Sequence, residues 1–259
     1  MSPRLLRLLR LLALVACVFG LAPTARADGL AADLSSHLVA ITSNFTGTSL
    51  LVFGAVEAEG PGRRDVVVVL RGPDREIVVR RKSPVAGLWL NTAARTYPAA
   101  PGFLAVAATR PLEQVASPEV LQRFQLDVPY LRLDPAAALD PRGDPGEDLA
   151  FREALIRLKT REGLYARTAA PVLFSGPNLF RAEIRVPSNV PPGNYKAEAY
   201  LFRDGALVAA QSSPLFIDKS GMERELFLLS REAPATYAGG AILLAVAAGW
   251  LAAYVFRRG

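Results

Sequence analysis

The first feature of the sequence is a series of short runs rich in Val, Ile, Leu and Phe, each bounded by turn residues. Such runs are typical of β-strands. Residues 72–74, a Gly-Pro-Asp break, lie between two runs that we expect to pair as an antiparallel hairpin. Residues 66–69 are predicted to be buried on both faces or to lie at the centre of a sheet. The runs are residues 37–42, 49–57, 66–70, 77–81, 85–90 and 103–107. Residues 28–110 are therefore predicted to form a first β-sandwich domain.

The pattern changes in residues 111–163, which we interpret as a helical and Pro/Gly-rich connector. Residues 111–125 are predicted to form two short helices, because proline is tolerated in a first helical turn. Residues 134–148 are dense in turn formers and are predicted to form a loop or hinge. Residues 149–162 are predicted to form an amphipathic helix that covers neighbouring strands, because apolar side chains recur there at helical spacing. This apolar stripe consists of Phe151, Leu155 and Leu158.

A second series of strand-like runs occupies residues 164–219. Residues 191–194 and 203–205 are rich in Pro, Gly, Asn and Asp and are predicted to form turns, the second of them in a hairpin. The runs are residues 165–168, 172–174, 180–186, 195–202 and 207–216. The Pro-Gly-x-Tyr segment is similar to strands of bacterial immunoglobulin-like domains. We expect a second, incomplete sandwich, so the fold class is mainly β, with two immunoglobulin-like units joined by a helical segment and one C-terminal transmembrane helix.

The C-terminal part of the chain is predicted to cross a membrane. Residues 237–256 contain no charged side chain, and a helix of that length covers the hydrocarbon core of a bilayer. We assign the span to residues 236–256 and a cytoplasmic tail to residues 257–259, because Arg257 and Arg258 follow directly and basic flanks stay in the cytoplasm. A juxtamembrane helix is predicted over residues 220–235 from a capping-box pattern.

The N-terminal segment is predicted to be a secretory signal peptide, residues 1–27. Three arginines precede an apolar run, and a small-x-small site ends at Ala27. Two alternatives remain open: lipidation of Cys17, or an uncleaved first membrane helix. Both ends of the chain favour export to the periplasm of a bacterium. The body of the chain would then lie outside the inner membrane, with the C-terminus inside.

Charge and cysteine content acquire a different meaning once the two ends are set aside. The chain has 30 basic and 24 acidic residues, but four of the basic residues lie in the signal segment and two in the cytoplasmic tail. The exported body therefore has a formal charge of zero, which gives no indication of nucleic-acid binding. Cys17 is the only cysteine and lies in the signal segment, so the body is expected to fold without a disulfide.

The sequence offers little catalytic chemistry. His37 is the only histidine, and it has no nucleophile motif beside it; a phosphate loop and a dinucleotide fingerprint are also absent from the sequence. The carboxylates Asp140, Asp144, Glu147 and Asp148 do not follow a calcium-loop spacing, and they are explained by the dipole of the helix that follows. We therefore expect a protein that is not an enzyme and that binds neither a cofactor nor a metal ion.

Two groups of residues are candidate contact surfaces. Five basic side chains fall on one predicted hairpin and could attract an anion or a partner, although charges also protect an edge hairpin against aggregation. They are Arg71, Arg75, Arg80, Arg81 and Lys82. Small residues at four-residue spacing form a ridge along the span, which would allow a helix of a permease or of a second copy to approach closely. A span this rich in Ala and Gly can also produce such a ridge by chance. They are Ala241, Ala245, Gly249 and Ala253.

The order of these segments resembles an uncharacterised family of alphaproteobacterial transmembrane proteins. The resemblance is carried by residues 35–55, 67–73, 79–82 and 87–91, by the helix and the Pro-Gly-x-Tyr turn, and by the last span. It implies a single-span protein of unknown activity, with no catalytic residue to carry over. It also implies an association with permeases that resemble sulfite or sulfonate exporters.

The sequence therefore predicts a membrane-anchored periplasmic protein that acts as a non-enzymatic accessory or interaction partner of a membrane transport complex. The alternative is a module that binds or senses a solute or anion and presents it to a permease. An exposed apolar patch favours the first function, and a concave pocket with converging polar groups favours the second.

Overall fold

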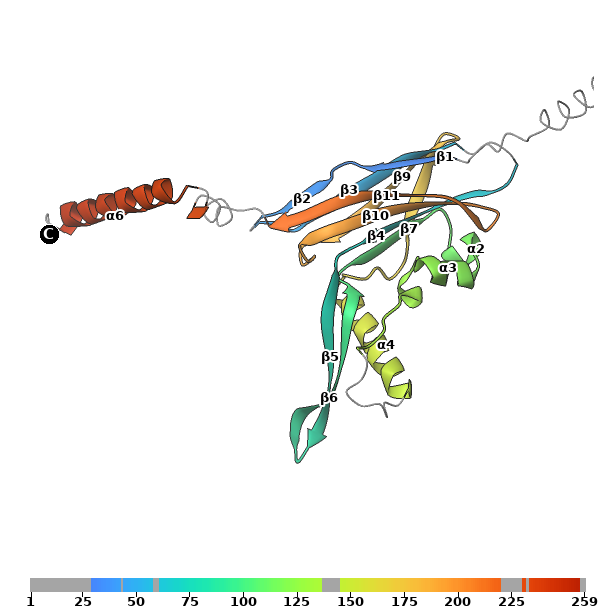
Figure 1. The fold of residues 1–259 in the computed structure, drawn as a ribbon, viewed down its shortest axis with the longest axis horizontal. Coiled ribbons are helices and arrows are strands. Elements are labelled where there is room, and N and C mark those ends of the chain that lie inside the picture. The colour runs from blue at the N-terminus through green and yellow to red at the C-terminus, as the bar shows by residue number, and fades with distance from the viewer. Residues whose placement is uncertain are drawn as a thin grey trace, which may run out of the picture.

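The computed structural model describes residues 29–42, 44–57, 61–136, 145–219, 230–231 and 233–256. Its main body is a nine-stranded sheet in the order β1-β3-β9-β8-β7-β4-β10-β11-β2, folded into a sandwich (Figure 1). The strands are β1 (Gly29–Leu34), β2 (Leu38–Ile41), β3 (Gly47–Glu57), β4 (Arg64–Arg71), β7 (Leu104–Ala108), β8 (Ala170–Ser175), β9 (Leu179–Pro187), β10 (Gly193–Arg203) and β11 (Ala206–Lys219). The mainly β fold class is confirmed.

Two separate sandwiches are not confirmed. We name β1, β3, β9 and β8 half-sheet A, and β7, β4, β10, β11 and β2 half-sheet B; a short parallel β7–β8 pairing joins them. Each half-sheet contains strands from both predicted units, and in each half a strand of the first unit pairs with a strand of the second. In half-sheet A, Leu50 of β3 lies opposite Ile184 of β9, and in half-sheet B, Val68 of β4 lies opposite Ala199 of β10. Strands from residues 28–110 and 164–219 thus share one sheet, because pairing between distant strands buries both sets of apolar side chains in one core.

Strand β4 is the centre of the fold, as its uninterrupted apolar sequence predicts. Its residues 66–70 are all 0% exposed. Val66 and Val68 point into the core between the two half-sheets, whereas Val67 and Val69 belong to a second core on the outer face of half-sheet B. A strand that is covered on both faces has no need of polar alternation, so it consists of consecutive valines.

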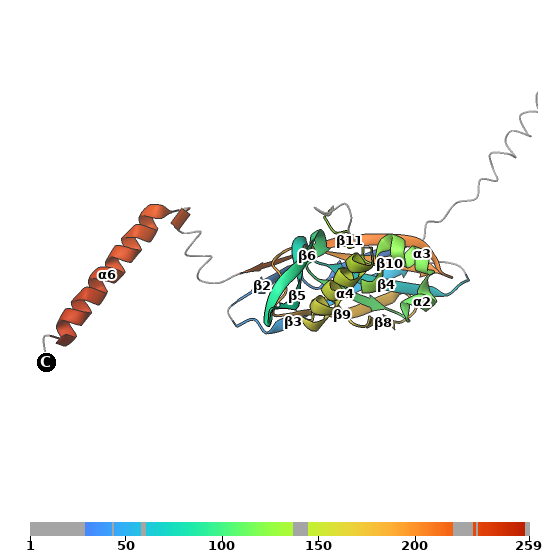
Figure 2. The same cartoon turned by 90° about the horizontal axis from the view of Figure 1, so that it is seen from below.

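Helices cover the outer face of half-sheet B, and Figure 2, seen from below, places them in front of the strands. The two predicted short helices are confirmed as α2 (Leu112–Val115) and α3 (Pro118–Phe124), and a 3₁₀ turn, η1 (Val128–Tyr130), follows. The predicted amphipathic helix is confirmed as α4 (Pro145–Arg161), which buries Phe151 and Leu155 but leaves Leu158 44% exposed. The remaining face of the sandwich, the outer face of half-sheet A, has no such cover among the described residues.

A long two-stranded hairpin leaves the sandwich beside α4 (Figure 1). It consists of β5 (Asp74–Val85) and β6 (Leu88–Pro101), which pair antiparallel with each other as a separate sheet, and we call it the arm. The predicted hairpin between residues 66–70 and 77–81 is wrong, because β4 pairs with β7 and β10 instead. The hairpin predicted at residues 203–205 is confirmed, with Asp204 and Gly205 in the left-handed conformation that such turns require.

The C-terminal helix α6 (Pro234–Phe256) confirms the predicted membrane span in length and composition. Within the described residues one helix, over Pro234–Ala253, is long and apolar enough to cross a membrane, and none of it is buried against the rest of the protein. The predicted signal peptide, the cytoplasmic tail, the acidic residues Asp140 and Asp144 and most of the predicted juxtamembrane helix lie outside the described residues.

Candidate functional site

The arm ends in a tight turn with an apolar tip. Residues 85–90 were predicted to form a single strand, but the chain reverses inside this run, where Ala86 and Gly87 have φ angles of 50° and 83°. Positive φ at both central residues matches the right-handed twist of a two-stranded hairpin. The turn places four apolar side chains at the tip, which we call the tip patch: Val85, Leu88, Trp89 and Leu90.

The tip patch is exposed to an unusual degree. The side chains of Trp89 and Leu88 are 69% and 66% exposed, and no described element covers them. Scattered single apolar side chains are normal on a protein surface, but a group of four around a tryptophan marks an interaction site. This is the exposed apolar patch that an accessory protein is expected to carry.

Helix α4 holds the arm in place through an ion-pair network. Arg95 of β6 donates to Asp148 at 2.6 Å and to Glu147 at 2.9 Å, and Arg81 of β5 donates to Glu147 at 2.7 Å. The hydrogen bond that Arg95 donates to Asp148 is the main cause that raises the pKa of Arg95, and the negative charges of Asp148 and Glu147 add to it. Both acids lie in the first turn of α4, where the helix dipole favours negative charge.

The ring of Phe151 lies beneath this network and is 3% exposed. The guanidinium carbons of Arg95 and Arg81 lie 5.4 and 5.6 Å from the ring centroid, within the range of cation–π attraction. Phe151 also belongs to the second core, together with Val79 and Tyr97 of the arm. The arm therefore continues the packed core of the protein as far as Arg81, and only its outer part projects beyond α4.

The root of the arm is fixed by backbone contacts. The Gly102 N–H donates to the Pro73 carbonyl at 2.8 Å, and the Tyr165 hydroxyl donates to the Pro101 carbonyl at 2.8 Å. Burial raises the pKa of Tyr165, so its hydroxyl stays protonated and keeps its role as donor. A Cβ atom at Gly102 would lie 2.8 Å from the Pro191 side chain, so this position requires glycine.

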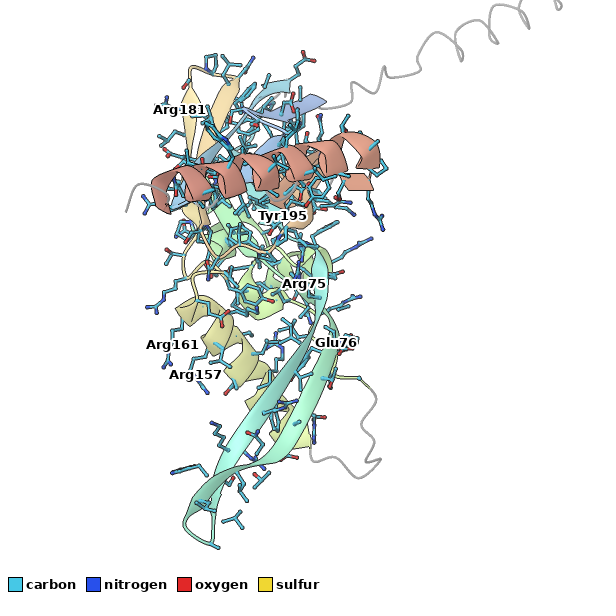
Figure 3. All side chains as sticks on the ribbon, turned by 90° about the vertical axis from the view of Figure 1, so that its left-hand side faces the viewer. Arg75, Glu76, Arg157, Arg161, Arg181 and Tyr195 are labelled. Carbon is cyan, nitrogen blue, oxygen red and sulfur yellow. The ribbon has the colours of Figure 1, made fainter. Side chains whose placement is uncertain are left out.

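The five basic residues predicted as a contact surface lie at different places. Arg71 donates to the Gln125 carbonyl and lies near Glu198, and Arg75 donates to the Pro192 carbonyl at 2.9 Å; both are at the root (Figure 3 labels Arg75). Arg81 belongs to the ion-pair network with α4. Arg80 and Lys82 are exposed; Arg80 precedes Arg81 on the braced part of the arm, whereas Lys82 pairs with Asn91, next to Leu90 of the tip patch. One of the five, Lys82, is thus placed beside the tip.

A cavity of about 590 Å³ opens at the root of the arm. Its wall combines three arginines and three carboxylates with the rings of Phe124 and Tyr200, whose centroids are 5.8 Å apart. Burial is the main cause that raises the pKa of Tyr200 to about 12. The charged groups in the wall are Arg71, Arg123, Arg132, Asp74, Asp134 and Glu198. Sequence reasoning did not find this cavity, because its residues come from five separate places: β4, the arm, α3 and its C-cap, the segment after η1, and β10.

Groups that could together bind a metal ion do not gather in the described part of the chain. No cluster of three or more His, Cys, Asp or Glu side chains occurs there. His37 lies at the surface, with Nδ1 3.1 Å from the Pro214 carbonyl and Nε2 3.2 Å from Asp33.

The predicted small-residue ridge follows one helix, α6, and all four of its residues are exposed. A helix with consecutive small side chains on one side can approach another membrane helix closely. The ridge consists of Ala241, Ala245, Gly249 and Ala253. Within the described residues none of the stretch Pro234–Ala253 is buried, so the structure leaves the ridge accessible to a neighbour.

Fold and site together define a membrane-anchored β-sandwich protein that carries a braced hairpin arm. The model of the family described as "Putative transmembrane protein (Alph_Pro_TM)" matches residues 29–258, and the chain belongs to this family. Comparison with curated proteins and comparison with solved structures each found no match.

Proposed function

We propose that this protein is a non-enzymatic accessory of a membrane complex and that the arm docks onto a partner membrane protein. The observation that carries the proposal is the tip patch: an exposed tryptophan with three aliphatic neighbours, presented on a hairpin that α4 holds in place. A hairpin with no other function would be expected to have a polar tip, because an exposed apolar strand end promotes aggregation.

The partner surface complementary to the arm is an apolar cleft with acidic groups at its rim. Trp89 and Leu88 provide the large apolar area that dominates binding energy in protein interfaces. Lys82 lies next to the tip patch and Arg80 lies exposed further down the same strand, and both favour carboxylates at the periphery, where charge contributes mainly to orientation and association rate. We propose a transport protein of the same membrane, such as a permease, as the class of partner. The single span holds this protein in the membrane where such a partner would lie.

The proposed location is the bacterial inner membrane, with the sandwich and arm in the periplasm and the C-terminus in the cytoplasm. Arg257 and Arg258 after the span support this orientation. The arginine-rich, then apolar, N-terminal segment supports export.

Site-specific photo-crosslinking of the full chain in native membranes tests the docking proposal. A photoreactive amino acid is placed at Trp89, and a matched control is placed at Leu158, an apolar residue of α4 that is 44% exposed. We expect one discrete protein adduct from position 89 and none from position 158. Reversal of the two exposed charges on this strand of the arm, with Arg80→Glu and Lys82→Glu in one variant, should reduce the adduct without changing the amount of protein.

Three results would contradict docking onto a protein. Adducts only to lipid would assign the tip patch to the bilayer interface, where tryptophan is also favoured. Equal adducts from positions 89 and 158 would show that the tip has no selective partner. Absence of any adduct at position 89, in cells that express the protein at its natural level, would also count against the proposal.

The cavity at the root of the arm supports a second candidate function, the binding of a small anionic or zwitterionic solute. Its three arginines can receive an anionic group, while its carboxylates and two aromatic rings can receive a cation. Titration of the purified full chain with taurine and with sulfate by calorimetry tests this function. Arg132→Ala should abolish the heat of binding, and Arg157→Ala on α4 should leave it unchanged; no heat with the unaltered protein, or equal heat from all three proteins, refutes it.

A further inference from the structure

The outer face of half-sheet A is the one sandwich face without a cover among the described residues. Helices and the arm lie on the opposite side, over half-sheet B (Figure 1, Figure 2). Four large apolar side chains nevertheless point outward from half-sheet A, and the most exposed, Leu179, is 55% exposed. They are Leu51, Phe53, Leu173 and Leu179. A sheet face of this composition is typical of a surface that is covered in the functional state.

Charged residues in the middle of this face are arranged in alternating order. Arg181, Glu183 and Arg185 follow one another on the outward side of β9, and Figure 3 labels Arg181. Among the described residues, neither Arg181 nor Glu183 has an ion-pair partner. Strand pairing places Phe53 and Leu173 on either side of Arg181, and Leu51 beside Glu183.

We infer that this face binds the same face of a second copy of the chain. A two-fold axis that crosses β9 at right angles, level with Ala182, places Arg181 of each copy opposite Glu183 of the partner subunit. The same operation places Phe53 opposite Leu51 of the partner subunit. On the other side of β9 it places Leu173 opposite Pro171 of the partner subunit, because Val172 pairs with Ala182.

The face is therefore complementary to itself at Arg181 and Glu183 and at the apolar residues beside them, while Leu179 of each copy would lie opposite Arg185 of the partner subunit. An interface with two-fold symmetry requires this property, because it uses one patch twice. Strands β9 of the two copies would run antiparallel, which agrees with the aligned packing that stacked sheets adopt. The hollow lined by these side chains, about 450 Å³, leaves room for the side chains of an opposite sheet.

The membrane anchor favours this pairing over an encounter in solution. Two copies that are held by one span each are confined to a plane, which raises their effective concentration. The ridge of Ala241, Ala245, Gly249 and Ala253 permits the two spans to approach each other. The inference does not depend on the arm, because the arm lies on the other side of the sandwich.

Charge reversal and its rescue test the inference. The full chain is purified in a density-matched detergent, and its self-association is measured by sedimentation equilibrium. We expect a dimer for the unaltered protein. Arg181→Glu and Glu183→Arg, each alone, should weaken association about tenfold, because each creates two like-charge contacts per dimer. The double variant Arg181→Glu with Glu183→Arg should restore it.

Arg157→Glu is the matched control, because Arg157 is an exposed arginine of α4, away from half-sheet A (Figure 3). It should leave the dimer unchanged. A monomer at all concentrations overturns the inference. A dimer that persists unchanged in both single variants also overturns it, because association would then rest on the spans alone. Failure of the double variant to recover, with circular dichroism unchanged, would also overturn the inference, because Arg181 and Glu183 would then not face each other across the dimer.

Discussion

Replacing Phe151 by alanine is predicted to release the arm from α4. The ring is 3% exposed, belongs to the second core, and lies beneath the guanidinium groups of Arg81 and Arg95. Alanine removes the apolar contact and leaves a cavity where the arm meets the helix. The ion pairs of Arg95 with Glu147 and Asp148 would remain, but no packed ring would hold their geometry.

The size of the effect follows from burial of the ring. Loss of a buried aromatic side chain removes about 1.5–3 kcal/mol of transfer free energy, and the cavity adds to this, so Phe→Ala changes cost about 3–5 kcal/mol in total. We expect about 3 kcal/mol for Phe151→Ala, because the cavity lies near the surface and can partly collapse. If the loss is local to the arm, it corresponds to amide exchange about 100-fold faster.

Hydrogen exchange measured by mass spectrometry on the full chain is the assay. Peptides from the arm, β5 and β6, should exchange faster in Phe151→Ala, whereas peptides from β3 and β9 should keep their protection, because they belong to the core between the half-sheets. Leu158→Ala is the control on the same helix and should change stability by no more than about 0.5 kcal/mol. Unchanged exchange in the arm would refute the reasoning that α4 braces it.

Two further predictions concern the sandwich. Asp65 is 2% exposed, and burial raises its pKa. The hydrogen bonds from Arg110 and Thr109, together with the charges of Arg110 and Arg63, outweigh burial, so the net pKa lies below its ordinary value. The Asp65–Arg110 ion pair therefore stabilises the fold above about pH 4, and this contribution is lost as the pH falls through the lowered pKa of Asp65. When the free energy of unfolding is measured against pH, it should fall less steeply toward acid pH in Asp65→Asn than in the unaltered protein. In Gly54→Ala, the added Cβ would lie 2.2 Å from the Ala31 carbonyl oxygen and 2.7 Å from the Phe180 ring. The free energy of unfolding, measured in urea, should therefore fall by at least about 2 kcal/mol. An unchanged urea midpoint would contradict this contact.

Local patterns in the sequence predicted the elements that local physics determines. The consecutive valines of β4, the apolar helix α6 and the stripe of α4 with Phe151 and Leu155 are each present in the structure. Burial on both faces, a membrane-length apolar run and helical spacing all leave their mark within one segment. None of them depends on which distant segment is the neighbour.

Strand pairing depends on distant segments, and there the prediction was wrong. Residues 66–70 were expected to pair with residues 77–81 across a Gly-Pro-Asp turn, but β4 pairs with β7 and β10, and β5 pairs with β6. The period-2 pattern shows that a strand has a buried face without showing which strand lies beside it. The prediction divided the strands into two units at the helical connector because it followed the order of the strands in the chain and not their pairing in space.

The candidate site was only partly accessible to sequence reasoning. The run at residues 85–90 has an apolar composition that suits a buried strand, and only Gly87 indicated the turn that exposes Trp89. Glu147 and Asp148 were explained by the helix dipole, and they do lie in the first turn of α4. Their pairing with Arg95, more than fifty residues earlier, could be found only from the structure.

The placement of the arm relative to the membrane is the central claim, and labelling of a single cysteine tests it most directly. Trp89→Cys in the full chain is treated with a membrane-impermeant maleimide in spheroplasts. The prediction is that position 89 reacts without lysis, whereas a cysteine placed at Arg258 reacts only after lysis. Labelling of position 89 only after lysis would place the arm in the cytoplasm and contradict the account.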